Sequence, residues 1–224
     1  MLYSEKVKLF AKQHPCEEIT VDGARYRYVL CGKAGARTLV FLNGGMVAQI
    51  YVQKYPGEAG GLILVSTGGM DEATLRTLKQ KYRLAPLMLW YMKHCNYEKL
   101  KPKLISASLR HIRDETPEEI AYAKDIFETT FRDFTQEKDV HISGLLADLM
   151  RQKPVTAADF AALEGKILLI LPDQDFFSGE MQRDLIALMH DPKIAYVSGG
   201  HLSTVLKTQD YVRVIREFLT ETFA

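Results

Sequence analysis

The chain has 224 residues, of which 47 % are apolar and 25 % are charged, and its formal net charge is +1. This composition is ordinary for a globular protein, and the length allows one large domain or a core with an inserted cap. Because the net charge is close to zero, it gives no electrostatic reason to expect binding to nucleic acid or to an anionic membrane, and we expect no nucleic-acid partner. No apolar run approaches the roughly 18 residues of a membrane span, so we predict no transmembrane segment.

The cysteines and the loop motifs exclude further classes of protein. Cys16, Cys31 and Cys95 are an odd, sparse set without CxxC spacing, which argues against a disulfide framework or a zinc site. No histidine pair has metal-ligand spacing with a carboxylate, and no phosphate-binding glycine loop is present, so we expect no metal, nucleotide or organic cofactor. The N-terminal stretch MLYSEKVKLFAKQHP is too charged for a signal peptide, and we interpret the protein as cytoplasmic.

The first predicted element is a β-hairpin near the N-terminus. Asp22-Gly23 separates two β-prone runs at residues 19–21 and 26–30. An Asp-Gly pair at this spacing is a strong hairpin signal, because both residues tolerate the backbone conformation of a two-residue turn.

A parallel strand–helix–strand unit is predicted next. The run TLVFL at 38–42 is continuously apolar, as expected of a strand buried on both faces, and GLILVST at 61–67 has the same character. Between them, residues 46–55 place apolar side chains on one helical stripe, which Pro56-Gly57 terminates. Two buried strands joined by one helix indicate a βαβ unit.

The pattern then changes to helices and later returns to strands. Residues 71–153 read as four or five helices without a strand, one of them starting at TPEE, 116–119, where Thr is an N-cap and Glu occupies N3. Strands return at 166–175 and 193–201, separated by a helix that begins near Ser178. An amphipathic helix, YVRVIREFLTETF, closes the chain.

Polar residues follow three of the predicted strands. In an open parallel sheet, ligands bind beyond the carboxyl ends of the strands. His201 follows Gly199-Gly200, and an imidazole at this edge could act as a general base. Asp175 could orient its ring, and Asp173 could take that role instead. Without such chemistry, His201 would be an ordinary loop histidine and Asp175 a loop or N-cap aspartate.

Four segments carry a resemblance to a known family: TLVFLNGG, GGMVAQIYVQKYPGEAGGLILVSTGG, ILLILPDQD and VSGGHLSTVLKTQDYVRVIREFL. They resemble the α/β-hydrolase fold, in the branch of small esterases and lipases. The resemblance implies a mostly parallel central sheet, formed by residues 1–70 and 154–224, with 71–153 as an inserted all-helical cap. It also implies Asp175 as the acid and His201 as the base of a triad. The loop with Gly44 and Gly45 would supply the oxyanion hole.

The nucleophile of that family is missing. The family carries a serine in a G-x-S-x-G turn, and no such motif occurs in this sequence, where Leu42 stands at the expected serine position. We therefore interpret the sequence as lacking two strands, their helices and the elbow between two segments that meet at Gly44-Gly45. Three explanations fit: a real deletion, a block that the protein has but this sequence lacks, or a divergent member with another nucleophile.

Ser66 is a weak candidate for a substitute nucleophile, since it ends the predicted strand at 61–67 and precedes Asp175 and His201 in triad order. Trp90, in the apolar stretch LAPLMLWYMKH, is the candidate for the wall of a substrate pocket, although such a cluster is more often the core of a cap helix.

These observations predict a hydrolase that cleaves an ester, thioester or amide of a small apolar substrate. The mechanism would be of the Ser-His-Asp type. Unless another residue replaces the missing serine, a chain of this length would be inactive toward simple esters. The alternative is a non-catalytic protein of the same fold that binds a small ligand or a partner. An oligomer is compatible with either prediction.

Overall fold

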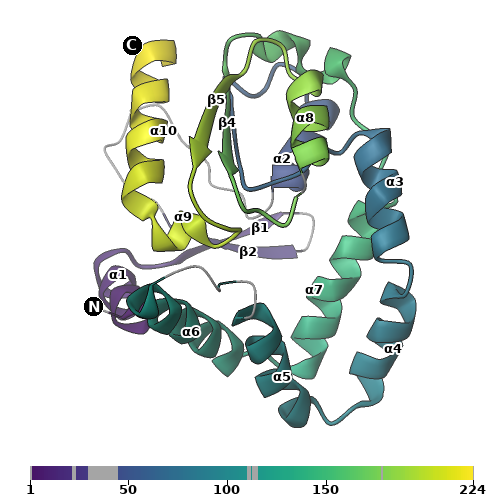
Figure 1. Cartoon of the computed structure of the whole chain (residues 1–224), viewed down its shortest axis with the longest axis vertical. Coiled ribbons are helices and arrows are strands. Elements are labelled where there is room, and N and C mark those ends of the chain that lie inside the picture. The colour runs from purple at the N-terminus through teal and green to yellow at the C-terminus, as the bar shows by residue number, and fades with distance from the viewer. Residues whose placement is uncertain are drawn as a thin grey trace.

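The computed structural model describes residues 2–21, 24–29, 45–109, 112, 116–177 and 179–223. The predicted strand at 38–42, the hairpin turn Asp22-Gly23, and the positions Cys31, Leu42 and Gly44 lie outside the described residues. Figure 1 shows the arrangement of the elements, whose order and bounds are α1 (Tyr3–Gln13), β1 (Glu17–Val21), β2 (Ala24–Tyr28), α2 (Gly45–Lys54), β3 (Leu62–Val65), α3 (Glu72–Lys81), α4 (Ala85–His94), α5 (Tyr97–Leu109), α6 (Pro117–Arg132), α7 (Gln136–Leu149), the 3-10 helix η1 (Ala157–Leu163), β4 (Ile167–Pro172), α8 (Gly179–Leu188), β5 (Lys193–Val197), α9 (Ser203–Leu206) and α10 (Thr208–Phe223).

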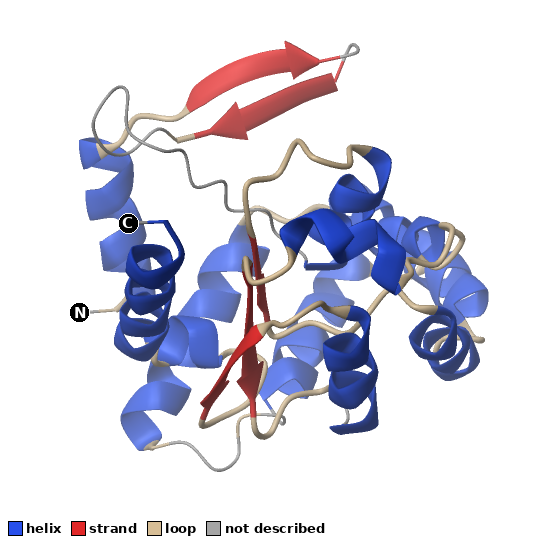
Figure 2. Ribbon diagram, turned by 90° about the horizontal axis from the view of Figure 1, so that it is seen from above, coloured by secondary structure: helices blue, strands red, loops and turns tan. Residues whose placement is uncertain are grey.

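The predicted hairpin is present. Strands β1 and β2 pair antiparallel, from Glu17 opposite Tyr28 to Val21 opposite Ala24, so only two residues connect them, as the Asp-Gly signal requires. The two strands form a sheet of their own, and Figure 2 shows it standing apart from the other strands.

The second sheet is parallel, with the strand order β3-β4-β5. Its strands confirm the three strands predicted after residue 60, with Leu62 opposite Ile167 at one end and Pro172 opposite Val197 at the other. Every residue of β4 is buried, because β4 lies between two strands and between two layers of helices (Figure 2). This explains why its sequence is continuously apolar rather than alternating.

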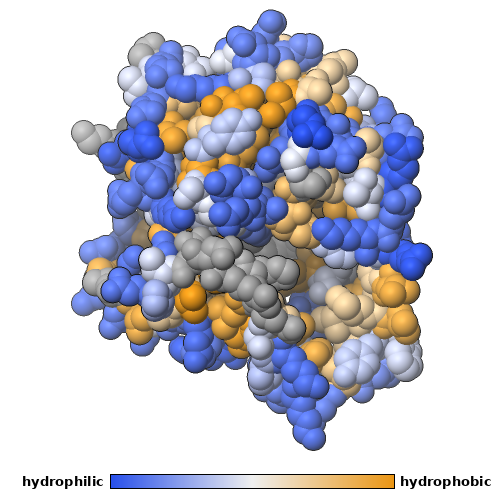
Figure 3. Space-filling model, in the orientation of Figure 1, coloured by the Kyte–Doolittle hydropathy of each residue, from blue (hydrophilic) through white to orange (hydrophobic). Residues whose placement is uncertain are grey.

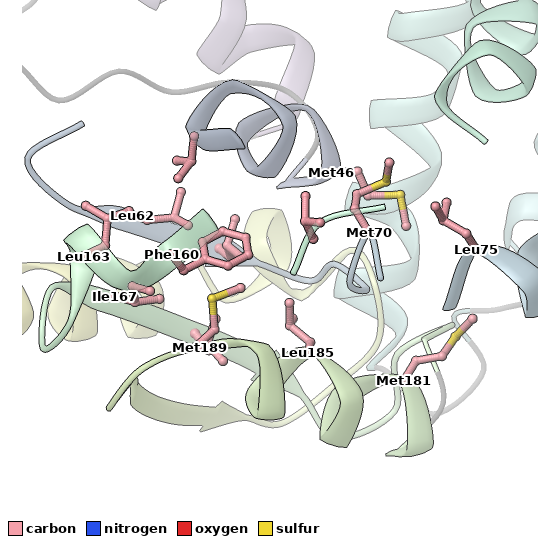
Figure 4. Close-up of a cluster of buried hydrophobic side chains, with 14 of the residues drawn as sticks. Met46, Leu62, Met70, Leu75, Phe160, Leu163, Ile167, Met181, Leu185 and Met189 are labelled. Atoms are coloured by element: carbon pink, nitrogen blue, oxygen red, sulfur yellow. The ribbon is translucent and has the colours of Figure 1, made fainter. Parts of the chain in front are cut away.

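Alternate residues of β4 point to opposite faces of the sheet and build two cores. On one face, Leu169 packs with residues of α2, η1 and α8, and Phe160 of η1 lies in the middle of this cluster (Figure 4). On the other face, Leu168 and Ile170 pack against Phe218 and its neighbours on α10. The amphipathic pattern of the last helix therefore reflects its place against the sheet. Helix α10 begins at Thr208, three residues before the predicted stretch.

Helix α2 is fixed to the loop after β3 by a buried glutamine. The Gln49 side chain is fully buried; its amide donates to the carbonyl of Gly68, and its carbonyl oxygen accepts from the backbone N–H of Met70. At the start of α2, a Cβ on Gly45 would lie 2.6 Å from Thr67 Cγ2. Only glycine allows this close approach, so the start of α2 and the end of β3 are neighbours.

The described residues of 71–153 contain helices α3 to α7 and no strand. The predicted start of α6 is confirmed: the Thr116 hydroxyl accepts from the N–H of Glu119, and the Glu119 carboxylate accepts from the N–H of Thr116. Helix α3 packs with the sheet, however, since Leu75 and Leu78 lie in the same hydrophobic cluster as residues of β4. The assignment of 71–153 as one cap stays a prediction.

Candidate active site at the carboxyl edge of the parallel sheet

The loops after β4 and β5 are joined directly at the edge of the sheet. The backbone N–H groups of Asp173 and Gln174 donate to the carbonyl oxygens of Val197 and Gly199, respectively, over 3.1 Å each. The Asp173 carboxylate accepts a hydrogen bond from the N–H of Gly199 at 2.8 Å. Asp173 therefore holds the exit loop of β5 and does not contact the histidine, which removes it as the alternative partner of His201.

Asp175 and His201 lie in direct contact. His201 Nδ1 is 3.0 Å from Asp175 Oδ1, and this oxygen also accepts a hydrogen bond from the N–H of Phe177 at 3.3 Å. The Asp175 side chain is 1 % exposed, whereas the His201 side chain is 56 % exposed. A buried carboxylate thus holds one edge of an imidazole that reaches solvent, the geometry in which an aspartate orients a general base.

The contact also determines the protonation chemistry of the ring. Because a carboxylate can only accept, Nδ1 carries a proton in this arrangement, and the lone pair of the neutral ring lies on Nε2. The hydrogen bond that His201 donates to Asp175 raises the pKa of His201 above its ordinary value, and this effect outweighs the opposing effect of partial burial. A raised pKa strengthens the ring as a proton acceptor while leaving it neutral above that pKa.

The replacement Asp175→Asn is expected to lower the pKa of His201, because it removes the negative acceptor while keeping the side-chain shape. An NMR titration of the His201 ring protons measures this directly. The stabilisation from the wild-type contact should be complete below about pH 6.5, the ordinary histidine value, and should be lost as the pH rises through the raised pKa of the folded protein. An unchanged His201 pKa in the variant would contradict the contact. Asp173→Asn is the control, since it should leave the titration nearly unchanged.

Aromatic rings cover the pair. The ring centroids of Phe176 and Phe177 lie 6.4 and 6.1 Å from that of His201. Phe177 also packs on Gly68, where an added Cβ would lie 2.7 Å from its ring, which connects this region to the end of β3. Lys81 Nζ, at the end of α3, lies 4.0 Å from the centre of the Phe176 ring. The surroundings of His201 are therefore largely apolar, with one cation at the rim.

Ser66 lies at the end of β3 in a strained conformation. Its φ is +48°, a value that costs free energy in a residue other than glycine and is common at functional turns. The Ser66 hydroxyl is buried and makes no hydrogen bond of normal length with any described residue. Burial raises the pKa of Tyr211, and the side chains of Ser66 and Ser203 both oppose this rise. The Ser66 hydroxyl therefore lies near the Tyr211 hydroxyl.

Sequence reasoning missed Ser203 and Tyr211. The Ser203 Oγ and the Tyr211 hydroxyl share a buried hydrogen bond of 2.6 Å. The charge of Asp175 also raises the pKa of Tyr211, so these hydroxyls are close to the carboxylate. No motif marks them, because Tyr211 reads as one more apolar position of the final helix. The second oxygen of Asp175, Oδ2, is buried without a hydrogen-bond partner among the described residues.

Two further predicted site residues, Gly45 and Trp90, lie within the described part of the chain. Gly45 is at the start of α2 beside Thr67, and Gly44 lies outside the described residues. Trp90 is 59 % exposed on α4, with its ring against His94. It is therefore not in a helical core, and its predicted place in a pocket wall stays a prediction.

Two cavities of about 500 Å³ lie in the helical region. Neither is lined by His201 or Trp90. One is lined by residues that include Cys95, Tyr97 and Arg132, and the other by residues that include Lys93 and His141. Among the described residues, no three His, Cys, Asp or Glu side chains gather as ligands for a metal ion.

Comparison with known proteins gives a structural match and no sequence match. No family model and no curated protein matches the sequence. A hydrolase from Pseudomonas aeruginosa PA01 has a similar structure, with a TM-score of 0.55, 16 % identity, and coverage of 79 % of this chain and 61 % of that chain. A candidate non-heme bromoperoxidase, BpoC, from Mycobacterium tuberculosis H37Rv has a TM-score of 0.55, 14 % identity, and coverage of 81 % of this chain and 65 % of that one.

This chain spans less than two thirds of the length of either structure. The parallel order β3-β4-β5, the helices on both faces, and these matches agree on the architecture, although the described sheet has few strands. At this level of identity the likeness concerns the fold. The chain has the α/β-hydrolase fold.

Proposed function

We propose that the protein is a hydrolase that cleaves an ester, thioester or amide of a small apolar substrate, with His201 as general base and Asp175 as its orienting acid. The observation that carries the proposal is the 3.0 Å contact between a buried Asp175 and an exposed His201 at the carboxyl edge of the sheet. The phenylalanine rings beside His201 support an apolar acyl or alkyl group. The structural match to a hydrolase supports the fold in which this pair would operate.

The proposal needs a nucleophile other than the elbow serine. Ser66 is the candidate, supported by its strained φ at a strand end and by its unpaired hydroxyl. In the acylation step, Ser66 Oγ would attack the carbonyl carbon while its proton passes to His201 Nε2 and then to the leaving group. Water would repeat the sequence and release the acid. Because Ser66 is buried, its hydroxyl must become accessible before it can react.

A fluorophosphonate probe tests the proposal, because it forms a covalent bond with an activated serine and not with a resting one. The experiment uses protein whose intact mass has been verified, together with Ser66→Ala and His201→Ala. We expect labelling of the wild type, loss of labelling in both variants, and an adduct on the peptide that contains Ser66. An adduct on another serine would identify that serine, and not Ser66, as the nucleophile, and the protein would still be assigned as a hydrolase.

The second candidate function is a non-catalytic binding protein of the same fold. The observation that favours it is the absence of a G-x-S-x-G motif anywhere in the sequence. It is the correct assignment if the verified wild-type protein shows neither labelling nor turnover of p-nitrophenyl esters. In that case the Asp175–His201 contact is structural.

A further inference from the structure

Helix α4 exposes an apolar face that no described element covers. Five large side chains on or beside this helix are between 53 % and 63 % exposed, namely Leu84, Leu87, Met88, Trp90 and Tyr91. Residues 84, 87, 88 and 91 follow the spacing of one helical stripe, and residue 90 lies beside it. This set is called the α4 face below. A contiguous apolar surface of this kind marks a site of association.

The charges in the sequence stretch that contains α4 are all of one sign, although α7, which packs on α4, brings Glu137 close to Lys93. Between Ala73 and Tyr97 the sequence contains no aspartate or glutamate. The same stretch carries five exposed cations, namely Arg76, Lys79, Lys81, Arg83 and Lys93. Within the described part of the chain none of them forms an ion pair with a carboxylate. Figure 3 shows apolar atoms over α4, at the lower right, below the hydrophilic atoms that cover α3.

The positive charge beside the α4 face indicates which kind of partner can bind there. A second copy of the chain bound through a two-fold axis would place the same surface on both sides of the interface. Cations of the stretch 73–97 would then approach their own copies, and that stretch itself holds no carboxylate to offset them, which disfavours such a dimer. An anionic lipid surface carries the complementary charge and also accepts apolar side chains at the boundary between headgroups and acyl chains.

We propose that the α4 face docks the protein on an anionic lipid bilayer, with α4 lying in the plane of the interface. Its apolar side chains would enter the headgroup boundary, and the surrounding cations would contact lipid phosphates. The net charge of +1 for the whole chain does not reveal this surface, because the acidic residues lie elsewhere. No helix in the described part of the chain is long and apolar enough to cross a membrane. The inference does not depend on catalysis by His201.

Trp90 makes the proposal directly measurable, because it is the single tryptophan of the chain. The protein is mixed at pH 7.5 with vesicles of phosphatidylglycerol and phosphatidylcholine in equal parts, or of phosphatidylcholine alone. We expect a blue shift of the tryptophan emission and co-flotation with the anionic vesicles, both weakened in 0.5 M salt. The zwitterionic vesicles should produce neither.

Two pairs of variants separate the apolar and the ionic contributions. Leu87→Asp should abolish the emission shift, whereas Leu9→Asp, the same change at an exposed position of α1, should retain it. Lys79→Glu with Arg83→Glu should weaken binding at least about 25-fold, because each cation lost near the membrane surface lowers the affinity about fivefold. Lys8→Glu with Lys12→Glu, on α1, makes the same change in net charge and should have little effect.

Several results would overturn the proposal. They are the absence of any emission shift, equal binding to both vesicle types, or unchanged binding of the Lys79→Glu/Arg83→Glu variant. A concentration-dependent dimer in sedimentation experiments that Leu87→Asp dissociates would assign the α4 face to a second copy instead. Far-UV circular dichroism verifies that each variant is folded. Fluorophosphonate labelling tests the site at His201 separately, so failure of one proposal does not imply failure of the other.

Discussion

Replacement of His201 by alanine is expected to lower kcat for a short-chain p-nitrophenyl ester by roughly 10³- to 10⁴-fold. A base that accepts the nucleophile's proton and returns it to the leaving group acts on the transition state, so its loss appears in kcat rather than in KM. Because the imidazole is 56 % exposed, its removal leaves the sheet and its two cores intact. The melting temperature should therefore change little.

The matched variants are Asp175→Asn and Asp173→Asn. Asp175→Asn should reduce kcat by a similar factor, since it leaves the ring without the acceptor that determines its tautomer. Asp173→Asn carries the same chemical change two residues away, on a carboxylate that holds the N–H of Gly199, and should reduce activity far less. Equal losses in the two variants would show that the exit loop of β5, and not the triad-like contact, controls the reaction.

Replacement of Phe160 by alanine is expected to lower the free energy of unfolding by about 3 to 5 kcal/mol. The Phe160 side chain is completely buried in the cluster between α2, α8 and the sheet (Figure 4). Its removal would leave a cavity that the surrounding strands and helices cannot fill without strain. This loss is a large part of the roughly 5 to 15 kcal/mol that stabilises a typical native protein. Urea denaturation followed by circular dichroism measures it.

Phe10→Ala is the control for this change in volume. Phe10 is largely exposed on α1, where its ring lies 4.7 Å from that of His14, and its removal should cost less than about 1.5 kcal/mol. A Phe160→Ala protein that unfolds within about 1 kcal/mol of the wild type would show that the core around η1 is not packed as described.

The elements that short sequence patterns define were predicted with few errors. The Asp-Gly turn predicted the hairpin, Thr116 and Glu119 predicted the start of α6, and continuous apolar runs predicted β3 and β4. In each case the decisive interactions join residues close in sequence, or depend on burial of both faces of one strand. Helix α1, η1 and α9 were not predicted, and η1 and α9 have only seven and four residues.

The partners of the site residues depended on contacts that are distant in sequence. Asp173 and Asp175 are equivalent by pattern, and they differ only because the twist and register of β4 and β5 direct one to the N–H of Gly199 and the other to the ring of His201, 26 residues away. The hydroxyls of Ser203 and Tyr211 are only eight residues apart in the chain, and they are buried because Tyr211 packs against the sheet beside Phe218.

Exposure is the other property that periodicity could not predict. The apolar stretch around Trp90 has the composition of a core helix, yet its side chains face solvent, because a hydrophobic stripe is buried only where another element lies opposite it. The sequence thus specified the strands, the helix starts and the residue types at the edge of the sheet. The packing of the sheet against its helices decided which aspartate holds His201 and left the α4 face uncovered by any described element, since both outcomes depend on elements that are far apart in the chain.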